Sequence, residues 1–341
     1  MNPGLLLLTS IAVLIVLRFL GFVGCAAILG VDDVSYATTP DGKPDYPATI
    51  KKETSLVAYW RLGELASTPV PSSGGQAKSE TGFHNGDYDK LPLATTADTV
   101  HHSPPTAGTL TLGVTPGLLE LDPTSPCIRT DGGFIQVPFD DALNPPQFTL
   151  EGWVKPDIGN DLPGNYYCLV ESSGPPGPLG ATKKTGFGLY LGPKDVPPAN
   201  PPGLHFWQIW MGDGSKFSQA AVSKNPVKFK QLTYLVLSFD GNNLQLFLYY
   251  PDTNQNLDQI SGELKASIGN FKRNDTSNLG TGNFFIGTGS NLYSGPSIPK
   301  QRLYPFKGQL QEVALYNVDL TAPNNQGLGK LAGHFLAGGK V

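Results

Sequence analysis

Carboxylates and histidines that could carry acid–base chemistry are scattered along the 341-residue chain. Glu151 and Glu312 each stand alone in a segment with a strand pattern, without a second carboxylate nearby in sequence. Hydrolysis of a glycosidic bond ordinarily needs two carboxylates acting together. His101 and His102 are adjacent, so their side chains point in opposite directions from an extended chain. These patterns predict no acid–base pair, and we expect a non-enzymatic protein.

Motifs for other kinds of chemistry are also missing. The sequence has no Gly-x-Ser-x-Gly nucleophile elbow, no phosphate-binding loop and no zinc-binding helix motif. Only 15% of the residues are charged and the formal net charge is −4, whereas a nucleic-acid-binding protein needs a clustered basic face. The composition therefore argues against nucleic acid as a partner.

The three cysteines are too far apart in sequence for a zinc site. Cys25 lies in an apolar N-terminal segment, and Cys127 and Cys168 lie in expected strands. Two interpretations of the latter pair stay open. They are either two buried thiols or a disulfide, and a disulfide requires an oxidising compartment.

Residues 5 to 30 are mostly apolar and carry one charge, Arg18, and a membrane-spanning helix needs about 20 mostly apolar residues. The segment is too long, and too poor in positive charge before residue 18, for a cleaved signal peptide. An uncleaved anchor is our prediction. The alternative is lipidation of Cys25, because the residues around it resemble a lipobox. Arg18 near the N-terminal end predicts a cytoplasmic N-terminus and a soluble domain in the periplasm or outside the cell.

The predicted membrane helix also carries features that lipid alone does not require. Arg18 is costly in a bilayer unless it finds a partner or reaches the interface. Gly21 and Cys25 are small and four residues apart, a spacing that lets two helices approach closely. We therefore expect Arg18, Gly21 and Cys25 to contact a neighbouring transmembrane helix in a larger membrane protein complex.

The remainder of the chain reads as a linker and one all-β domain. Residues 31 to 54 lack periodicity and predict an extended linker. From residue 55 to 341, short β-rich runs alternate with turns, and Gly (41) and Pro (31) are frequent. The clearest signal is a pair of apolar runs around the turn at Asp240–Asn243, which predicts a hairpin. Residues 65 to 115 and 172 to 203 are expected to be mostly long loops, and residues 327 to 336 a short helix.

The order of these runs resembles the bacterial laminin G-like, concanavalin A-like jelly rolls. The resemblance rests on LVAYWRLGE (from residue 56), GGFIQVP (132 to 138), FTLEGWVKP (148 to 156), LTYLVLSFDG (232 to 241) and FKGQLQEVALYNVDL (306 to 320). It implies a two-sheet antiparallel sandwich and leaves the function open, because this fold hosts lectins, glucanases and structural modules. Many such domains bind calcium near the final strand. Gln311 stands there where the family usually has Asp, so we expect no resident cofactor and leave calcium open without assigning ligands.

Two functions follow as hypotheses. The first is a membrane-anchored interaction or structural protein, an accessory subunit that contacts a larger complex through its helix and sandwich. The second is a carbohydrate-binding, lectin-like module at the cell surface, in which exposed aromatics stack on sugars. Trp207 and Trp210 are three residues apart in one strand and must lie on opposite faces, so one of them belongs to the core. The similar pairs are Tyr166 with Tyr167 and Tyr249 with Tyr250, and each of these rings either packs in the sandwich or stacks on a sugar.

Overall fold

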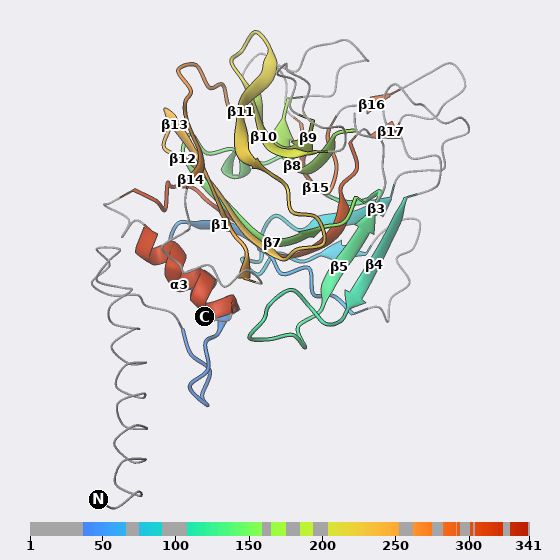
Figure 1. Cartoon of the computed structure of the whole chain (residues 1–341), viewed down its shortest axis with the longest axis vertical. Coiled ribbons are helices and arrows are strands. Elements are labelled where there is room, and N and C mark those ends of the chain that lie inside the picture. The colour runs from blue at the N-terminus through green and yellow to red at the C-terminus, as the bar shows by residue number, and fades with distance from the viewer. Residues whose placement is uncertain are drawn as a thin grey trace, which may run out of the picture.

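The computed structural model is a sandwich of two antiparallel sheets, which confirms the all-β class expected from the sequence (Figure 1). It describes residues 37–65, 75–90, 108–158, 165–174, 185–193, 204–251, 262–274, 282–290, 292–293, 301–302, 304–322 and 328–339. All structural statements below concern these residues.

The first sheet has the strand order β14-β13-β12-β7-β18-β5-β4, with β1 also paired to β18. Its strands are β1 (Leu56–Trp60), β4 (Thr109–Val114), β5 (Cys127–Asp131), β7 (Phe148–Pro156), β12 (Thr233–Phe239), β13 (Asn243–Tyr249), β14 (Gly262–Ser267) and β18 (Lys307–Tyr316). The strand β18 pairs with β1, β5 and β7, so the last strand of the domain lies inside the sheet beside one of the first.

The second sheet has the order β11-β10-β9-β8-β15-β6-β3-β2. Its strands are β2 (Gln76–Ala77), β3 (Gly86–Lys90), β6 (Gly133–Val137), β8 (Tyr167–Ser173), β9 (Gly186–Gly192), β10 (Phe206–Gly212), β11 (Phe217–Pro226) and β15 (Phe284–Ile286). A small separate ribbon pairs β16 (Leu292–Tyr293) with β17 (Gln301–Arg302), and a 3-10 turn, η1, covers Asp141–Leu143. The segment 65 to 115, expected as loop, contributes the short strands β2 to β4.

The main core lies between the two sheets and is built from alternate residues of each strand. Aromatic pairs join the sheets directly. Phe148 of β7 stacks on Phe187 of β9 with ring centroids 4.3 Å apart, and Trp60 of β1 stacks on Phe284 of β15 at 5.4 Å. Such contacts hold the faces together through both apolar burial and ring geometry.

The predicted hairpin at Asp240–Asn243 is confirmed. It connects β12 to β13, and the Asp240 carboxylate accepts hydrogen bonds from the backbone N–H groups of Asn242 at 2.7 Å and Asn243 at 2.5 Å. Gly241 has φ +98°, a conformation that glycine adopts without strain.

Two helices cover the outer face of the first sheet. They are α2 (Tyr46–Lys51) and α3 (Leu328–Gly338), and the expected C-terminal helix is thereby confirmed. Figure 1 shows α3 in red along the outside of the sandwich. Phe335 of α3 packs on Tyr249 of β13 at 3.9 Å and on Trp153 of β7 at 5.7 Å, which makes a second hydrophobic cluster outside the main core.

The prediction of an extended linker over residues 31 to 54 is wrong for the part the structure describes. The Asp45 side chain caps α2 by accepting from the Ala48 N–H at 2.9 Å, and Pro47 lies in the first turn. Tyr46 and Ile50 are buried against the first sheet. The sequence lacked visible periodicity because this helix spans less than two turns, so only tertiary packing stabilises it.

The predicted membrane helix at residues 5 to 30 lies outside the described residues. Among the residues that are described, no helix is both long enough and apolar enough to span a bilayer.

Candidate functional site

Aromatic side chains gather on the face of the second sheet that points away from the core. Alternation along β10 sends Trp207 into the core and Trp210 to the opposite face, as the spacing of the two tryptophans predicted. In β9, Leu189 points into the core while Tyr190 shares the outer face with Trp210. The rings on this outer face therefore take no part in the core between the sheets.

Five rings form one continuous group on this face, which we call the aromatic face: Tyr166, Tyr190, Trp210, Phe217 and Tyr304. Trp210 contacts Tyr166 edge-on, with centroids 6.3 Å apart, and lies nearly parallel to Phe217 at 6.4 Å. Tyr304 lies 6.0 Å from Tyr166 and 5.9 Å from Tyr190. Tyr190 is buried, whereas the other four rings are only partly buried.

Tyr304 reaches this group from a distant part of the chain. Its carbonyl accepts a hydrogen bond from the backbone N–H of Cys168 in β8 at 2.7 Å, which attaches the segment before β18 to the second sheet. The backbone of Tyr304 has φ +64°, an uncommon conformation for a residue with a side chain. Strained residues of this kind gather at functional sites, where the surrounding structure holds them in place.

Two glycines let the tyrosine rings lie close to the sheet. A Cβ atom at Gly192 would fall 2.4 Å from the Tyr166 ring, and one at Gly188 would fall 2.6 Å from the Tyr190 ring. Both distances are far below van der Waals contact. The rings therefore occupy the space that side chains at positions 188 and 192 would need.

A carboxylate lies beside the rings at the buried side of the aromatic face. Glu171 of β8 accepts hydrogen bonds from the hydroxyls of Tyr190, Ser173 and Ser290, the last at 2.6 Å. Glu171 and Trp210 are both register partners of Gly188, so they lie in one row across three strands. The buried carboxylate therefore fixes the Tyr190 hydroxyl beneath the aromatic face.

Two glutamines on the same face differ in their bonding. The Gln208 amide is occupied at both ends, since its Oε1 accepts from Trp210 Nε1 at 3.1 Å and its Nε2 donates to the Pro193 carbonyl at 2.5 Å. Gln219 of β11 is the register partner of Trp210. Its Nε2 is shielded from solvent and has no hydrogen-bond partner in the described structure.

A second cluster of ionisable groups lies under the helices, on the outer face of the first sheet. Glu151 of β7 is buried and accepts from the hydroxyls of Tyr234 at 2.5 Å and Tyr316 at 2.7 Å. His334 of α3 lies between two glutamates. Its Nδ1 is 3.0 Å from a carboxylate oxygen of Glu151, and its Nε2 is 3.4 Å from a carboxylate oxygen of Glu53. Burial alone would lower the pKa of His334, but the two glutamates raise it to about 9. His334 is thus a buried cation paired with carboxylates, which is an arrangement that joins helices to a sheet.

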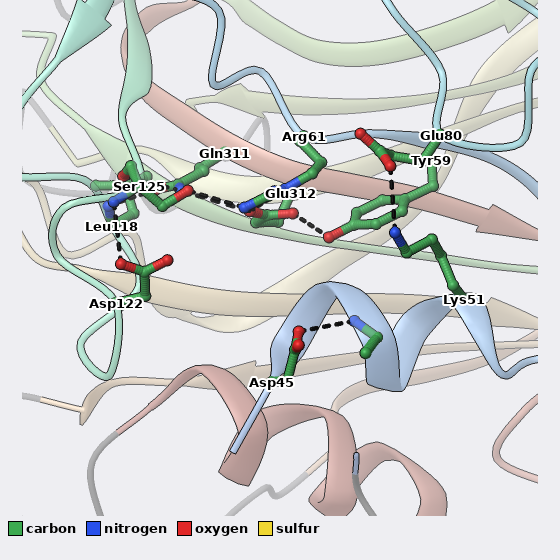
Figure 2. A network of polar contacts seen from close by, with 11 residues as sticks. Asp45, Lys51, Tyr59, Arg61, Glu80, Leu118, Asp122, Ser125, Gln311 and Glu312 are labelled. Carbon is green, nitrogen blue, oxygen red and sulfur yellow. Dashed lines mark hydrogen bonds and ion pairs between the residues drawn. The ribbon is translucent and has the colours of Figure 1, made fainter. Parts of the chain in front are cut away.

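A third cluster surrounds Glu312, at an irregular point of β18 where the register shifts between Gln311 and Ala314 (Figure 2). Glu312 is buried, accepts from the Tyr59 hydroxyl and pairs with Arg61 at 3.3 Å. Burial raises the pKa of Glu312 to about 7, although Arg61 and Tyr59 oppose that rise. Glu312 is thus a strand residue in a salt bridge with Arg61, and its carboxylate is buried and not solvated.

Gln311, which stands where the calcium-binding domains usually have Asp, stabilises a loop. Its Oε1 accepts from the Leu118 N–H at 2.5 Å and its Nε2 donates to the Ser125 carbonyl at 3.2 Å, which fastens the loop between β4 and β5 (Figure 2). Within the described ranges, no group of three or more acidic, histidine or cysteine side chains is placed to hold a metal ion. Calcium binding stays an open hypothesis without ligands.

The sequence-predicted contact residues are placed as follows. Arg18, Gly21 and Cys25 lie outside the described residues. Cys127 in the first sheet and Cys168 in the second are buried free thiols, so the structure contains no disulfide between them. Cys127 packs in the cluster on the outer face of the first sheet, whereas the Cys168 thiol lies beside Glu171 on the outer face of the second sheet, so the two side chains point to opposite sides of the sandwich.

Sequence reasoning named Tyr166 and Trp210 as candidate sugar-stacking residues but missed Tyr304, Phe217, Glu171 and Gln219. Each sits in a strand or next to one, with no local motif around it. The signal that could have found Gln219 is the alternation of β11, which puts it two residues from Phe217 on the same face.

No protein-family description matches the chain, and no curated protein sequence is similar to it. Similar solved structures share 13 to 15% identity in the three cases that follow. Domain 4 of AbnA, a GH43 extracellular arabinanase from Geobacillus stearothermophilus in complex with arabinotriose, matches at 14% identity and TM-score 0.44, over 81% of this chain and 98% of that one. Trypanosoma rangeli sialidase matches at 15% and TM-score 0.42, over 89% of this chain and 36% of that one.

The exoplasmic domain of VIP36 in its Ca2+/Man2-bound form matches at 13% identity and TM-score 0.34, over 62% of this chain and 79% of that one. These structures are lectin-like and glycosidase-like β-sandwiches, and none of them singles out laminin G. The prediction of a non-enzymatic protein is corrected by this comparison, because the similar structures include chains of an arabinanase and a sialidase. Missing sequence motifs were an insufficient basis for that prediction, since catalytic groups can come together from distant strands.

Proposed function

We propose that the protein binds a carbohydrate on the aromatic face. The observation that carries the proposal is the set of four partly exposed rings, Tyr166, Trp210, Phe217 and Tyr304, collected on the side of the second sheet away from the core. Aromatic rings offer large, rigid, apolar surfaces, and the apolar C–H groups of a sugar ring can pack against them. Sites for small molecules combine such surfaces with a few fixed polar groups.

The polar groups of this face hold the rings in place. The buried Glu171 accepts from the Tyr190 hydroxyl, and the Trp210 indole is oriented by its hydrogen bond to Gln208. An oriented ring loses little conformational freedom when a ligand stacks on it. Packing between the sheets does not explain why these rings are there. The main core contacts the other face of the strands β8, β9 and β10.

The test is a binding measurement on the full chain in a detergent without a sugar headgroup, which would otherwise compete. A panel of oligosaccharides that includes arabinotriose and the Man2 disaccharide is titrated by calorimetry. We expect wild-type binding to at least one of them and a loss of about 10-fold or more in affinity for Trp210→Ala, roughly 1.4 kcal/mol.

Phe83→Ala is the matched control, because Phe83 is an aromatic side chain that is 72% exposed in the turn before β3, away from the aromatic face. It should bind as wild type does. If no oligosaccharide of the panel binds, or if Trp210→Ala binds like Phe83→Ala, the proposed site is wrong.

The location of the chain is a separate proposal, supported by the sequence alone. Residues 5 to 30 would anchor it in a membrane with the sandwich in the periplasm or outside the cell, and Arg18, Gly21 and Cys25 would contact a partner helix. Alkaline extraction of membranes tests the anchor, because an integral protein stays in the pellet while a peripheral protein is released.

A further inference from the structure

In the strands of the second sheet, Trp207 and Gln219 each have a buried polar atom without a hydrogen-bond partner in the described structure, and of the two only Gln219 lies on the aromatic face. Its Nε2 is shielded from solvent and donates to nothing in the described structure. A buried amide that has given up water without gaining a partner costs free energy, and such groups are rare in folded proteins. The described part of the chain supplies no acceptor for the Gln219 amide nitrogen.

The position of Gln219 points to the explanation. It is the register partner of Trp210 across β10 and β11, and directly opposed side chains of an antiparallel pair have Cβ atoms about 4.5–5.5 Å apart. Phe217, two residues earlier, stacks against the same indole. Gln219 as a whole is only half-buried, so its amide lies close beneath the surface beside these rings.

Gln208 provides the comparison within the same face. Its amide oxygen accepts from the Trp210 indole and its amide nitrogen donates to the Pro193 carbonyl, so Gln208 is fixed in the position that orients the indole. Gln219 is placed on the other side of Trp210 and keeps its donor free. Gln208 thus holds the Trp210 ring in place, and Gln219 is positioned to contact the edge of a ligand that stacks on this ring.

We propose that Gln219 donates a hydrogen bond from its side-chain amide to an oxygen of the sugar that stacks on Trp210, and thereby helps to select the sugar. This inference rests on the proposed function. A hydroxyl or ring oxygen at the edge of a stacked sugar supplies the acceptor that the amide lacks. A ligand without an oxygen at that edge leaves the amide unpaired, so the site discriminates against it.

The experiment compares Gln219→Met with the control Gln245→Met, a glutamine of similar exposure on β13 of the other sheet. Methionine keeps the length of the side chain and removes the amide. We expect Gln219→Met to weaken binding of the oligosaccharide found for wild type by about 10-fold. Its melting temperature should be equal to or above that of wild type, because the unpaired amide is gone. Gln245→Met should leave affinity unchanged.

A second measurement identifies the contact. Monodeoxy forms of the same oligosaccharide are titrated against wild type and Gln219→Met. One monodeoxy sugar should bind wild type more weakly than the parent oligosaccharide does. The same monodeoxy sugar and the parent oligosaccharide should bind Gln219→Met with equal affinity, because the missing sugar oxygen and the missing amide belong to one interaction.

Three outcomes separate the two proposals. Loss of binding by Trp210→Ala with full binding by Gln219→Met overturns the role of Gln219 and leaves the aromatic face as the site. A fall in melting temperature for Gln219→Met without loss of affinity overturns it as well, since the amide would then be structural. Absence of binding by wild type overturns the proposed function, and the inference falls with it.

Discussion

His334 and Glu151 form a buried ion pair in which Nδ1 of the imidazole lies 3.0 Å from a carboxylate oxygen. His334 belongs to α3, near the C-terminal end of the chain, and Glu151 to β7 in the middle of the first sheet. Through Glu53, at 3.4 Å from the other ring nitrogen, the same histidine reaches the segment after α2. The pair therefore ties both helices to the sheet that they cover.

Removal of His334 should destabilise the protein. His334→Gln leaves the Glu151 carboxylate buried without its cation, and we expect a loss of about 3–5 kcal/mol in the free energy of unfolding. Denaturation by urea, followed by tryptophan fluorescence, measures the change. A loss below about 1 kcal/mol would show that the hydroxyls of Tyr46, Tyr234 and Tyr316, which all donate to Glu151, suffice to hold its charge.

The same histidine should make stability fall at alkaline pH. The pKa of His334 rises from 6.5 to about 9 on folding, so folding favours the protonated form. Its contribution is fully present below pH 6.5 and is lost as pH rises through 9. Wild type should lose stability across this window, and His334→Gln should not. Parallel curves for the two proteins would contradict the shift.

Glu312 should produce a pH dependence at lower pH. Burial raises its pKa from 4.5 to about 7, so the folded state binds a proton that the unfolded state releases. The contribution of Glu312 to stability is therefore fully present below pH 4.5 and is lost as pH rises through 7, by up to about 3 kcal/mol. Glu312→Gln should flatten the curve between pH 4.5 and 7. The partly exposed Glu80, which pairs with Lys51 nearby, provides the control variant Glu80→Gln, for which the wild-type slope should persist.

The thiols of Cys127 and Cys168 should be unreactive until the protein unfolds. Both are buried, and burial raises the pKa of Cys127 to about 11, so little thiolate exists at neutral pH. Alkylation of a Cys25→Ser variant, followed by intact mass, should add two labels in denaturant without reductant and none in the native state. If the cysteines form a disulfide, the intact mass will be 2 Da lower than that of the chain with two free thiols, and no label will be added in denaturant.

Asn274 should be needed for stability although its sequence, Asn274-Asp275-Thr276, matches a glycosylation signal. It is buried, donates to the Gly282 carbonyl at 2.8 Å and accepts from the Gly282 N–H at 3.1 Å. We expect Asn274→Ala to cost about 1–3 kcal/mol, because it leaves buried backbone groups unpaired. Thermal unfolding measures it, and an unchanged melting temperature would contradict the structural role.

The sandwich class could be predicted because alternation and turn chemistry are local. The Asp240 turn, the two faces of the Trp207 strand and the C-terminal helix were all visible as short-range patterns. The sequence does not predict the helix α2, because its few residues carry no clear period and Asp45 is recognisable as its cap only in the structure. The short strands β2 to β4 were missed for a related reason, since two to six residues give too few alternations to stand out from a loop.

Local patterns in the sequence were enough to predict the class of fold and which residues of a strand share a face. Which strands are neighbours is known only from the folded structure. Glu151, Glu171 and Glu312 all look like lone carboxylates in the sequence, yet all three are buried with partners, such as Tyr316, which is 165 positions from Glu151. The aromatic face likewise brings Tyr166 next to Tyr304. Such pairs depend on the order of strands in the sheets, and the physical reason is that a period of two fixes a side chain's face without fixing its neighbours.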